Sequence, residues 1–309
     1  MTETQRGAAW IVLGMALVAL SDIFLLGISG DVGLWQFQAM RAAMVLPVCL
    51  VGLSLTVGIG VAAAKSLRRV AERSALVTLA LLLYFAALPA IPLAQAAAGL
   101  FTSPIWIILF TAMAERRFVG PRRLLSVMIG FGGVCLVLGV GAEPLRPMAA
   151  VAIASGAAYG AGVIWTRRHC AGETAIALSV WLFGAFFCAG LVGMLATPLL
   201  QGLIGNVGGT EFATRGPVPV TVNTLAMVFL IGSLALSASA CLAQGYRSAE
   251  PTIVGLFDYS FLFWISLWSL VLFGEAPSVR EIAGMTLIVA AGGLALWSDR
   301  YRAAASNPS

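Results

Sequence analysis

Long apolar runs separated by short basic clusters dominate this sequence and limit what it can fold into. Of the 309 residues, 60% are hydrophobic and 10% are charged, and the charges gather between apolar runs of about 20 residues. A helix rises about 1.5 Å per residue, so about 20 residues cross a hydrocarbon core about 30 Å thick. A soluble domain of this length would need far more polar surface. We therefore predict an all-α membrane protein.

Ten runs predict ten transmembrane helices: 8–28, 34–54, 74–91, 93–114, 124–141, 148–166, 175–197, 223–245, 251–272 and 279–298. With the N-terminus placed in the cytoplasm, fourteen of the eighteen Lys and Arg residues fall on the cytoplasmic side. Most belong to Lys65/Arg68/Arg69/Arg73, Arg116/Arg117/Arg122/Arg123 and Arg167/Arg168. Because cytoplasmic loops are enriched in Lys and Arg, both termini are predicted to be cytoplasmic, with the first helix retained. The external stretch 198–222 predicts an irregular loop, with or without a short interfacial helix.

The same spacing between a glutamate and a glycine occurs in both halves of the chain. Gly133 follows Glu115 by eighteen residues, and Gly293 follows Glu275 by the same distance. Five spans in each half would make the halves inverted relative to one another, as in many secondary transporters. The predicted repeats are residues 1–141 and 142–309. Chance recurrence in Gly-rich helices explains the spacing equally well.

Three charged residues lie well inside predicted spans: Asp22, Arg41 and Asp258. A charge near the bilayer centre costs roughly 2.5–3.5 kcal/mol on insertion scales, so each requires an explanation. Asp22 and Arg41 both lie about 10 Å below the outer interface, and sequential helices usually neighbour each other, so a buried pair is expected. Such a pair either locks two helices together or exchanges partners with substrate or proton. Snorkelling of Arg41 to the surface is a third reading.

Asp258 has no obvious cationic partner in its own helix. Burial penalises its charged form, which suits a coupling or substrate-binding role. Arg247 lies near the same interface and offers a static alternative.

Several neutral polar residues could complete a binding cavity. The predicted site comprises Asp22, Arg41, Gln38, Tyr84, Gln95, Tyr159, Asp258, Tyr259 and Trp264. Aromatic residues at helix ends are more often part of the interfacial belt, so Trp35, Trp165 and Tyr246 are left out. Pro89 and Pro92 flank a predicted turn, and Pro104 is expected to bend the fourth span.

The sequence lacks the motifs of an enzyme. It contains no phosphate loop, no Ser/His/Asp arrangement and no metal-spaced cluster, and its single histidine, His169, lies among loop arginines. The five cysteines show no paired spacing. We expect no enzymatic activity, cofactor, metal or nucleic-acid partner.

Two sets of motifs resemble the EamA-type drug/metabolite transporter superfamily over nearly the whole chain. In the second half they are Gln244-Gly-Tyr-Arg-Ser-Ala-Glu-Pro, Val254-Gly-Leu-Phe-Asp-Tyr259, Phe273-Gly-Glu-Ala-Pro277 and Ile282-Ala-Gly284. In the first half they are Asp22 followed by Arg41, Ile91-Pro-Leu-Ala-Gln95, Ser103-Pro104 and Glu115-Arg116. The resemblance implies ten helices in two inverted repeats and transport of a small metabolite, nearest to the S-adenosylmethionine-type and riboflavin-type carriers.

The chain departs from that family at Leu26, where many relatives carry lysine, and at Leu256, where proline is common. Both changes lie near the presumed cavity, so the substrate of a relative is not assigned to this chain.

The prediction is an inner-membrane secondary transporter that moves a small polar or amphipathic metabolite by alternating access. The alternatives are an exporter of amino acids or toxic amphiphiles and a membrane scaffold or sensor without flux. The expected partners are a small-molecule substrate and the lipid bilayer. Proton coupling and a monomeric or homodimeric state stay open.

Overall fold

The computed structural model describes residues 3–28, 30–87, 93–115, 120–138, 140, 148–204, 211–248, 255–274 and 276–305. Within these ranges the regular structure is helical, without strands. Seven helices in the described part of the chain are long and apolar enough to cross a bilayer. The chain is therefore a multi-pass α-helical membrane protein.

The helices are α1 (Glu3–Ile28), α2 (Leu34–Thr56), α3 (Leu67–Ala87), α4 (Leu93–Leu100), α5 (Ser103–Glu115), α6 (Pro121–Leu138), α7 (Ala149–His169), α8 (Ala175–Ile204), α9 (Glu211–Thr214), α10 (Val222–Ser248), α12 (Ser260–Phe273) and α13 (Val279–Ala305). Two 3-10 helices join them, η1 (Ile59–Ala62) and η2 (Gly255–Tyr259). Several predictions fall outside the described residues: Pro89, Pro92, Arg116, Arg117, Arg146, Glu275 and the boundary between 141 and 142.

The predicted fourth span, 93–114, is wrong as a continuous helix. It divides into α4 and α5 at a turn formed by Phe101 and Thr102. Pro104 has no N–H for the helical bond to the carbonyl of Leu100, so that bond is missing at the break. The Thr102 hydroxyl donates to the carbonyl of Gly99 at 2.6 Å and satisfies one acceptor that the break leaves free.

The predicted external loop, 198–222, is shorter than expected. Helix α8 continues through Ile204 and contains Pro198 within it. The short helix that the sequence allowed is present as α9. Gln36 of α2 holds the segment beyond α9, accepting from the Val218 N–H at 3.0 Å and donating to its carbonyl at 2.7 Å.

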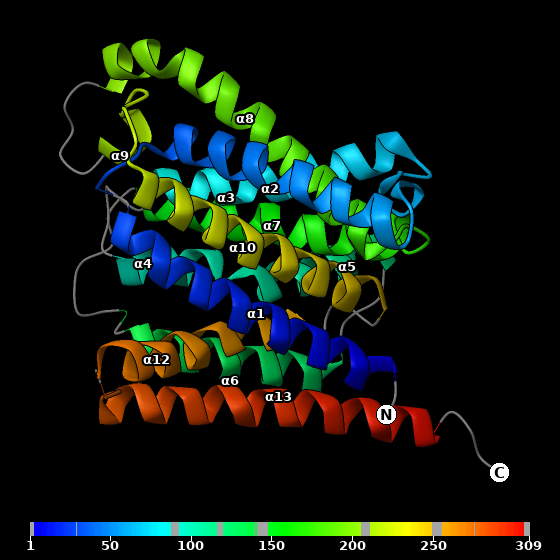
Figure 1. The fold of residues 1–309 in the computed structure, drawn as a ribbon. Helices are drawn as coiled ribbons and strands as arrows, with labels where there is room; N and C mark the ends of the chain where they lie inside the picture. The colour runs from blue at the N-terminus through cyan, green and yellow to red at the C-terminus, as the bar shows by residue number, and fades with distance from the viewer. Residues whose placement is uncertain are drawn as a thin grey trace.

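The long helices run along a common axis, and α1 begins at the same end of the bundle at which α13 ends (Figure 1). The main neighbours are α1 with α10, α3 with α7, α2 with α8 and α6 with α13. Small residues allow the closest approaches: a Cβ on Gly133 of α6 would lie 2.7 Å from the Gly284 carbonyl oxygen of α13. Membrane helices associate through close packing of this kind.

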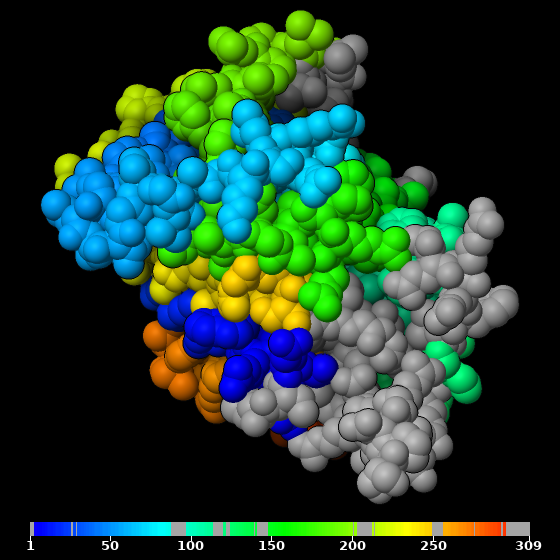
Figure 2. Space-filling model, turned by 90° about the vertical axis from the view of Figure 1, so that its right-hand side faces the viewer, coloured from blue at the N-terminus to red at the C-terminus, as the bar shows by residue number. Residues whose placement is uncertain are grey.

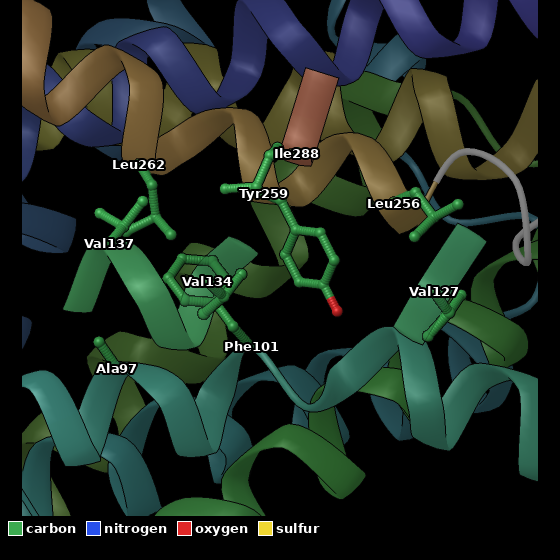
Figure 3. Close-up of a cluster of buried hydrophobic side chains, with 9 residues drawn as sticks. All are labelled: Ala97, Phe101, Val127, Val134, Val137, Leu256, Tyr259, Leu262 and Ile288. Atoms are coloured by element: carbon green, nitrogen blue, oxygen red, sulfur yellow. The ribbon is translucent and has the colours of Figure 1, made fainter. Parts of the chain in front are cut away.

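A buried apolar cluster fixes η2 and α12 against α4 and α6 (Figure 3). Its members are Ala97, Phe101, Val127, Val134, Val137, Leu256, Tyr259, Leu262 and Ile288. The Tyr259 side chain is fully buried among them, and its ring packs edge-to-face on Phe101 with centroids 6.1 Å apart. This packing holds the neighbouring residue, Asp258, in place at the bundle interior.

Candidate functional site

A cavity of about 170 Å³ lies inside the bundle. Residues from α1, α2, α3, α4, α5, α7, α8, α10, η2 and α12 line it. The lining is mainly apolar, but it includes four charged residues: Asp22, Arg41, Arg73 and Asp258. Cavities of about 150 Å³ accommodate a benzene-sized molecule, so this one has room for a small organic group.

Five of the nine predicted site residues meet at this cavity: Asp22, Arg41, Tyr84, Tyr159 and Asp258. Three others are described by the structure but are not part of the lining. Gln38 is fully buried, and its amide has no hydrogen-bond partner among the described residues. Tyr259 belongs to the core cluster, and Trp264 stacks on Trp268 with centroids 6.0 Å apart. The side chain of Gln95 lies outside the described part.

Arg41 of α2 lies in a cage of three phenylalanine rings. Its guanidinium carbon is 5.1 Å from the ring centroid of Phe37, 5.4 Å from Phe183 and 4.6 Å from Phe186. The residue is 7% exposed, and its Nε has no hydrogen-bond partner in the described structure. The ring faces attract the cation without providing the oxygen acceptors that its N–H groups require. Arg41 therefore remains an unsatisfied buried donor at the cavity wall.

The predicted direct pair between Asp22 and Arg41 is not formed. Among side chains that the structure describes, the ion pair in direct contact is Arg68–Glu72 at 2.9 Å. Asp22 and Arg41 both line the cavity, but their charged groups are not in direct contact. The physical reason is helix order, because α10 packs against both α1 and α2 and lies between them (Figure 1). A Cβ on Gly232 of α10 would lie only 2.7 Å from Val45 of α2.

Arg73 is a cavity residue that the sequence analysis assigned to a cytoplasmic cluster. It is 4% exposed, and it donates from Nε to the Thr166 hydroxyl at 3.3 Å and from Nη1 to the Leu178 carbonyl at 3.0 Å. These bonds join α3 to α7 and α8. Helical periodicity could have found it, because Arg73 shares a face with the buried Val70 and Val77.

Asp258 is 1% exposed and has a partner that the sequence did not predict. The Tyr246 hydroxyl donates to its Oδ1, and the hydroxyls of Tyr246 and Tyr159 are 3.3 Å apart. Its Oδ2 has no hydrogen-bond partner among the described residues. No sequence spacing predicts this contact, which depends on how the chain returns after α10. Tyr246, which was left out as an interfacial residue, is thus buried at the site.

The proposed alternative for Asp258, a contact with Arg247, is wrong. Arg247 donates instead to the Gln244 side chain at 2.8 Å and to the Glu173 carbonyl at 2.6 Å. These bonds direct the guanidinium away from the cavity and toward the chain between α7 and α8. Arg247 therefore fastens the end of α10 and makes no hydrogen bond to Asp258.

A second cavity of about 370 Å³ adjoins the first and shares Asp22, Tyr84, Phe85 and Phe261 with it. Its other lining residues lie toward one end of the bundle: Leu25, Ala97, Leu138, Leu262, Ile265, Ser266, Ser269, Ala276, Pro277 and Glu281. The hydrogen bonds of Arg73 and Tyr246 lie toward the opposite end. Figure 2 views that opposite end, where described atoms of α1, α3, α7 and α10 form a continuous face.

The chain is similar in sequence to proteins named for transport. A riboflavin transporter of Rhizobium johnstonii is 30% identical over 208 residues, which are 67% of this chain and 63% of that protein. This chain thus matches less than two thirds of that relative's length. The pseudopaline exporter CntI of Pseudomonas aeruginosa is 26% identical over 224 residues, 71% of each chain.

The fold has a counterpart among solved structures. A protein of known crystal structure matches 97% of this chain and 98% of its own, with a TM-score of 0.71 and 20% sequence identity. At that identity the likeness concerns the fold alone. No family model matches the chain, so the resemblance to the EamA-type superfamily stays a prediction. This multi-pass membrane protein is therefore similar in sequence to a riboflavin transporter and to a pseudopaline exporter.

Proposed function

We propose that this protein is a secondary transporter that moves a small polar or amphipathic metabolite across the membrane by alternating access. The observation that carries the proposal is the cavity inside the bundle, with Asp22, Arg41, Arg73 and Asp258 on its wall. Charged side chains buried in a membrane are costly and typically mark substrate or ion pathways. A passive scaffold would have little reason to retain four of them around one space. The transporter and exporter relatives support the same reading.

The proposed architecture is ten transmembrane segments in two inverted repeats, residues 1–141 and 142–309. In this count α4 and α5 form one broken segment, as do η2 and α12, and α9 is not a segment. A two-fold exchange of the halves would carry the pair α1–α10 onto α7–α3, and would carry α2–α8 and α6–α13 onto themselves. These four are the main helix pairs of the bundle, which supports the repeat. The motif order supports assignment to the EamA-type superfamily.

The proposed orientation places both termini in the cytoplasm of the inner membrane. Lys65, Arg68 and Arg69 are exposed at the end at which α1 begins, and the excess of basic residues there supports a cytoplasmic face. In this orientation the second cavity leads toward the outside. The hydrogen bonds of Arg73 and Tyr246 then close the cytoplasmic end, so the conformation described is outward-facing.

A flux measurement in proteoliposomes tests the proposal. The purified protein is reconstituted, and accumulation or efflux of a panel of labelled small metabolites is compared with that in empty liposomes, with and without an imposed proton gradient. We expect saturable flux of at least one compound, lost in Asp258→Asn and retained in the exposed-site control Lys65→Gln. Folded protein that moves no compound of the panel would favour the scaffold or sensor. Sensitivity to the gradient would identify proton coupling, and the direction of flux would separate uptake from export.

A further inference from the structure

The connection between α2 and α3 exposes a run of apolar side chains at one end of the bundle. Leu55, in the last turn of α2, is 81% exposed, and Val57 and Ile59 beyond it are 62% and 57% exposed. Ile59 begins the 3-10 helix η1, and the exposed Leu67 begins α3. Contact between such side chains and water is unfavourable, so they indicate a partner with an apolar surface.

The chain between α7 and α8 holds this connection in place. Glu173 is buried, and its carboxylate accepts hydrogen bonds from the backbone N–H groups of Lys65 at 2.9 Å and Ser66 at 2.8 Å. The Thr174 hydroxyl donates to the Val61 carbonyl at 2.6 Å. A carboxylate that accepts backbone N–H bonds just before a helix also interacts favourably with the helix dipole. The exposed apolar side chains therefore belong to an ordered surface.

Exposed cations directly follow the apolar run. They are Lys65, Arg68 and Arg69. The acid of the same segment, Glu72, pairs with Arg68 at 2.9 Å, so two positive charges remain in excess. The Trp165 indole donates to the Arg69 carbonyl at 3.1 Å and lies beside these cations. Apolar side chains, cations and an indole ring in one place are typical of the boundary between acyl chains and headgroups.

A phospholipid fits this surface better than the other possible occupants. A soluble anion would neutralise the cations but leave the apolar side chains in water. A second copy of the chain, packed by a two-fold axis on the same surface, would bring like charges together. Figure 2 shows the connection, in light blue and cyan, projecting at the margin of this end of the bundle. The surrounding bilayer would meet the protein there.

We infer that the α2–α3 connection binds an anionic phospholipid, with the headgroup on Lys65 and Arg69 and an acyl chain against Leu55, Val57 and Ile59. The inference does not depend on transport or on the proposed orientation, because it concerns only which lipid contacts this end of the bundle. Near a membrane surface each Lys or Arg strengthens the binding of anionic lipid about fivefold.

Lipid selectivity is the first test. The purified protein is given equal amounts of dioleoylphosphatidylglycerol and dioleoylphosphatidylcholine, which share their acyl chains and differ in net charge, and the retained lipids are counted by native mass spectrometry. We expect the wild type to prefer phosphatidylglycerol. Arg69→Gln should reduce that preference about fivefold and Lys65→Gln/Arg69→Gln about 25-fold. Arg280→Gln removes one exposed cation from the opposite end of the bundle and should leave the preference unchanged.

The depth of the apolar run is the second test. Ile59→Cys is made in a chain whose five native cysteines have been removed, and a nitroxide is attached in phosphatidylglycerol-containing vesicles. Collisions with oxygen, which concentrates in the acyl region, are compared with collisions with a water-soluble nickel chelate. We expect the label at Ile59 to meet oxygen and to be shielded from nickel. Ala171→Cys, exposed in the chain between α7 and α8, is the control and should meet nickel.

Equal retention of the two lipids by the wild type would overturn the inference, as would equal effects of Arg69→Gln and Arg280→Gln. A label at Ile59 that meets nickel as readily as the label at Ala171 would show that the run faces water. Spin–spin broadening at Ile59 that disappears on dilution with unlabelled protein would show that a second copy covers the surface. Either result would refute the lipid as its occupant.

Discussion

Replacing Tyr246 by phenylalanine removes the hydroxyl that donates to the buried Asp258 carboxyl group. Asp258 is 1% exposed, and its other oxygen already lacks a hydrogen-bond partner among the described residues. Leaving a buried acceptor without its donor costs about 1–3 kcal/mol, which corresponds to about 5- to 150-fold in an equilibrium constant. The aromatic ring remains, so no cavity is created. We expect Tyr246→Phe to lower the free energy of unfolding by about 1–3 kcal/mol.

The assay is unfolding of the purified protein in detergent, with Tyr259→Phe as the matched control. The Tyr259 side chain is also fully buried, but its hydroxyl has no partner among the described residues, so its removal should be neutral or stabilising. The losses in Tyr246→Phe and Asp258→Asn should be less than additive in the double variant, because both changes remove the same contact. Equal effects of Tyr246→Phe and Tyr259→Phe would refute the assigned contact.

Three further results are expected. In a double-mutant cycle of Asp22→Asn and Arg41→Gln, the coupling should stay below about 1 kcal/mol, because the side chains are not in contact; about 2 kcal/mol or more would reveal a direct pair. Burial raises the pKa of the Cys170 thiol to about 11, so its alkylation should be slow at pH 8 and accelerate about tenfold per pH unit toward 11. Rapid labelling at pH 8 would contradict its burial. A cysteine at Lys65 should react from the cytoplasm and one at Arg215 from outside, and the reverse pattern would invert the orientation.

Hydrophobic patterning predicted where the helices lie because a bilayer requires long uninterrupted apolar segments. The predicted cores of α1, α2 and α7 lie inside the observed helices, and only their ends moved. The break between α4 and α5 was expected as a bend, since Pro104 was recognised. Its extent could not be predicted, because it depends on the turn that Thr102 stabilises.

The candidate site was predictable in its charges but not in their partners. Asp22, Arg41 and Asp258 were identified because a buried charge in an apolar run is improbable without a role. The predicted contact between Asp22 and Arg41 was wrong. The prediction assumed that sequential helices are neighbours, whereas α10 lies between α1 and α2. Arg73 and Tyr246 were missed because helix ends commonly carry basic and aromatic residues, and only packing distinguishes the buried ones.

The most direct test of alternating access is the accessibility of a cysteine inside the cavity. Ala235 of α10 lines it and tolerates a cysteine of similar size, whereas Ser237 on the same helix is exposed on the outer surface of the bundle. Each is replaced by cysteine in a chain whose five native cysteines have been removed. A membrane-impermeant maleimide is then applied to right-side-out and to inside-out vesicles. Alternating access predicts that Ala235→Cys reacts from both sides and Ser237→Cys from neither. Reaction of Ala235→Cys from one side only, or from none, would contradict it.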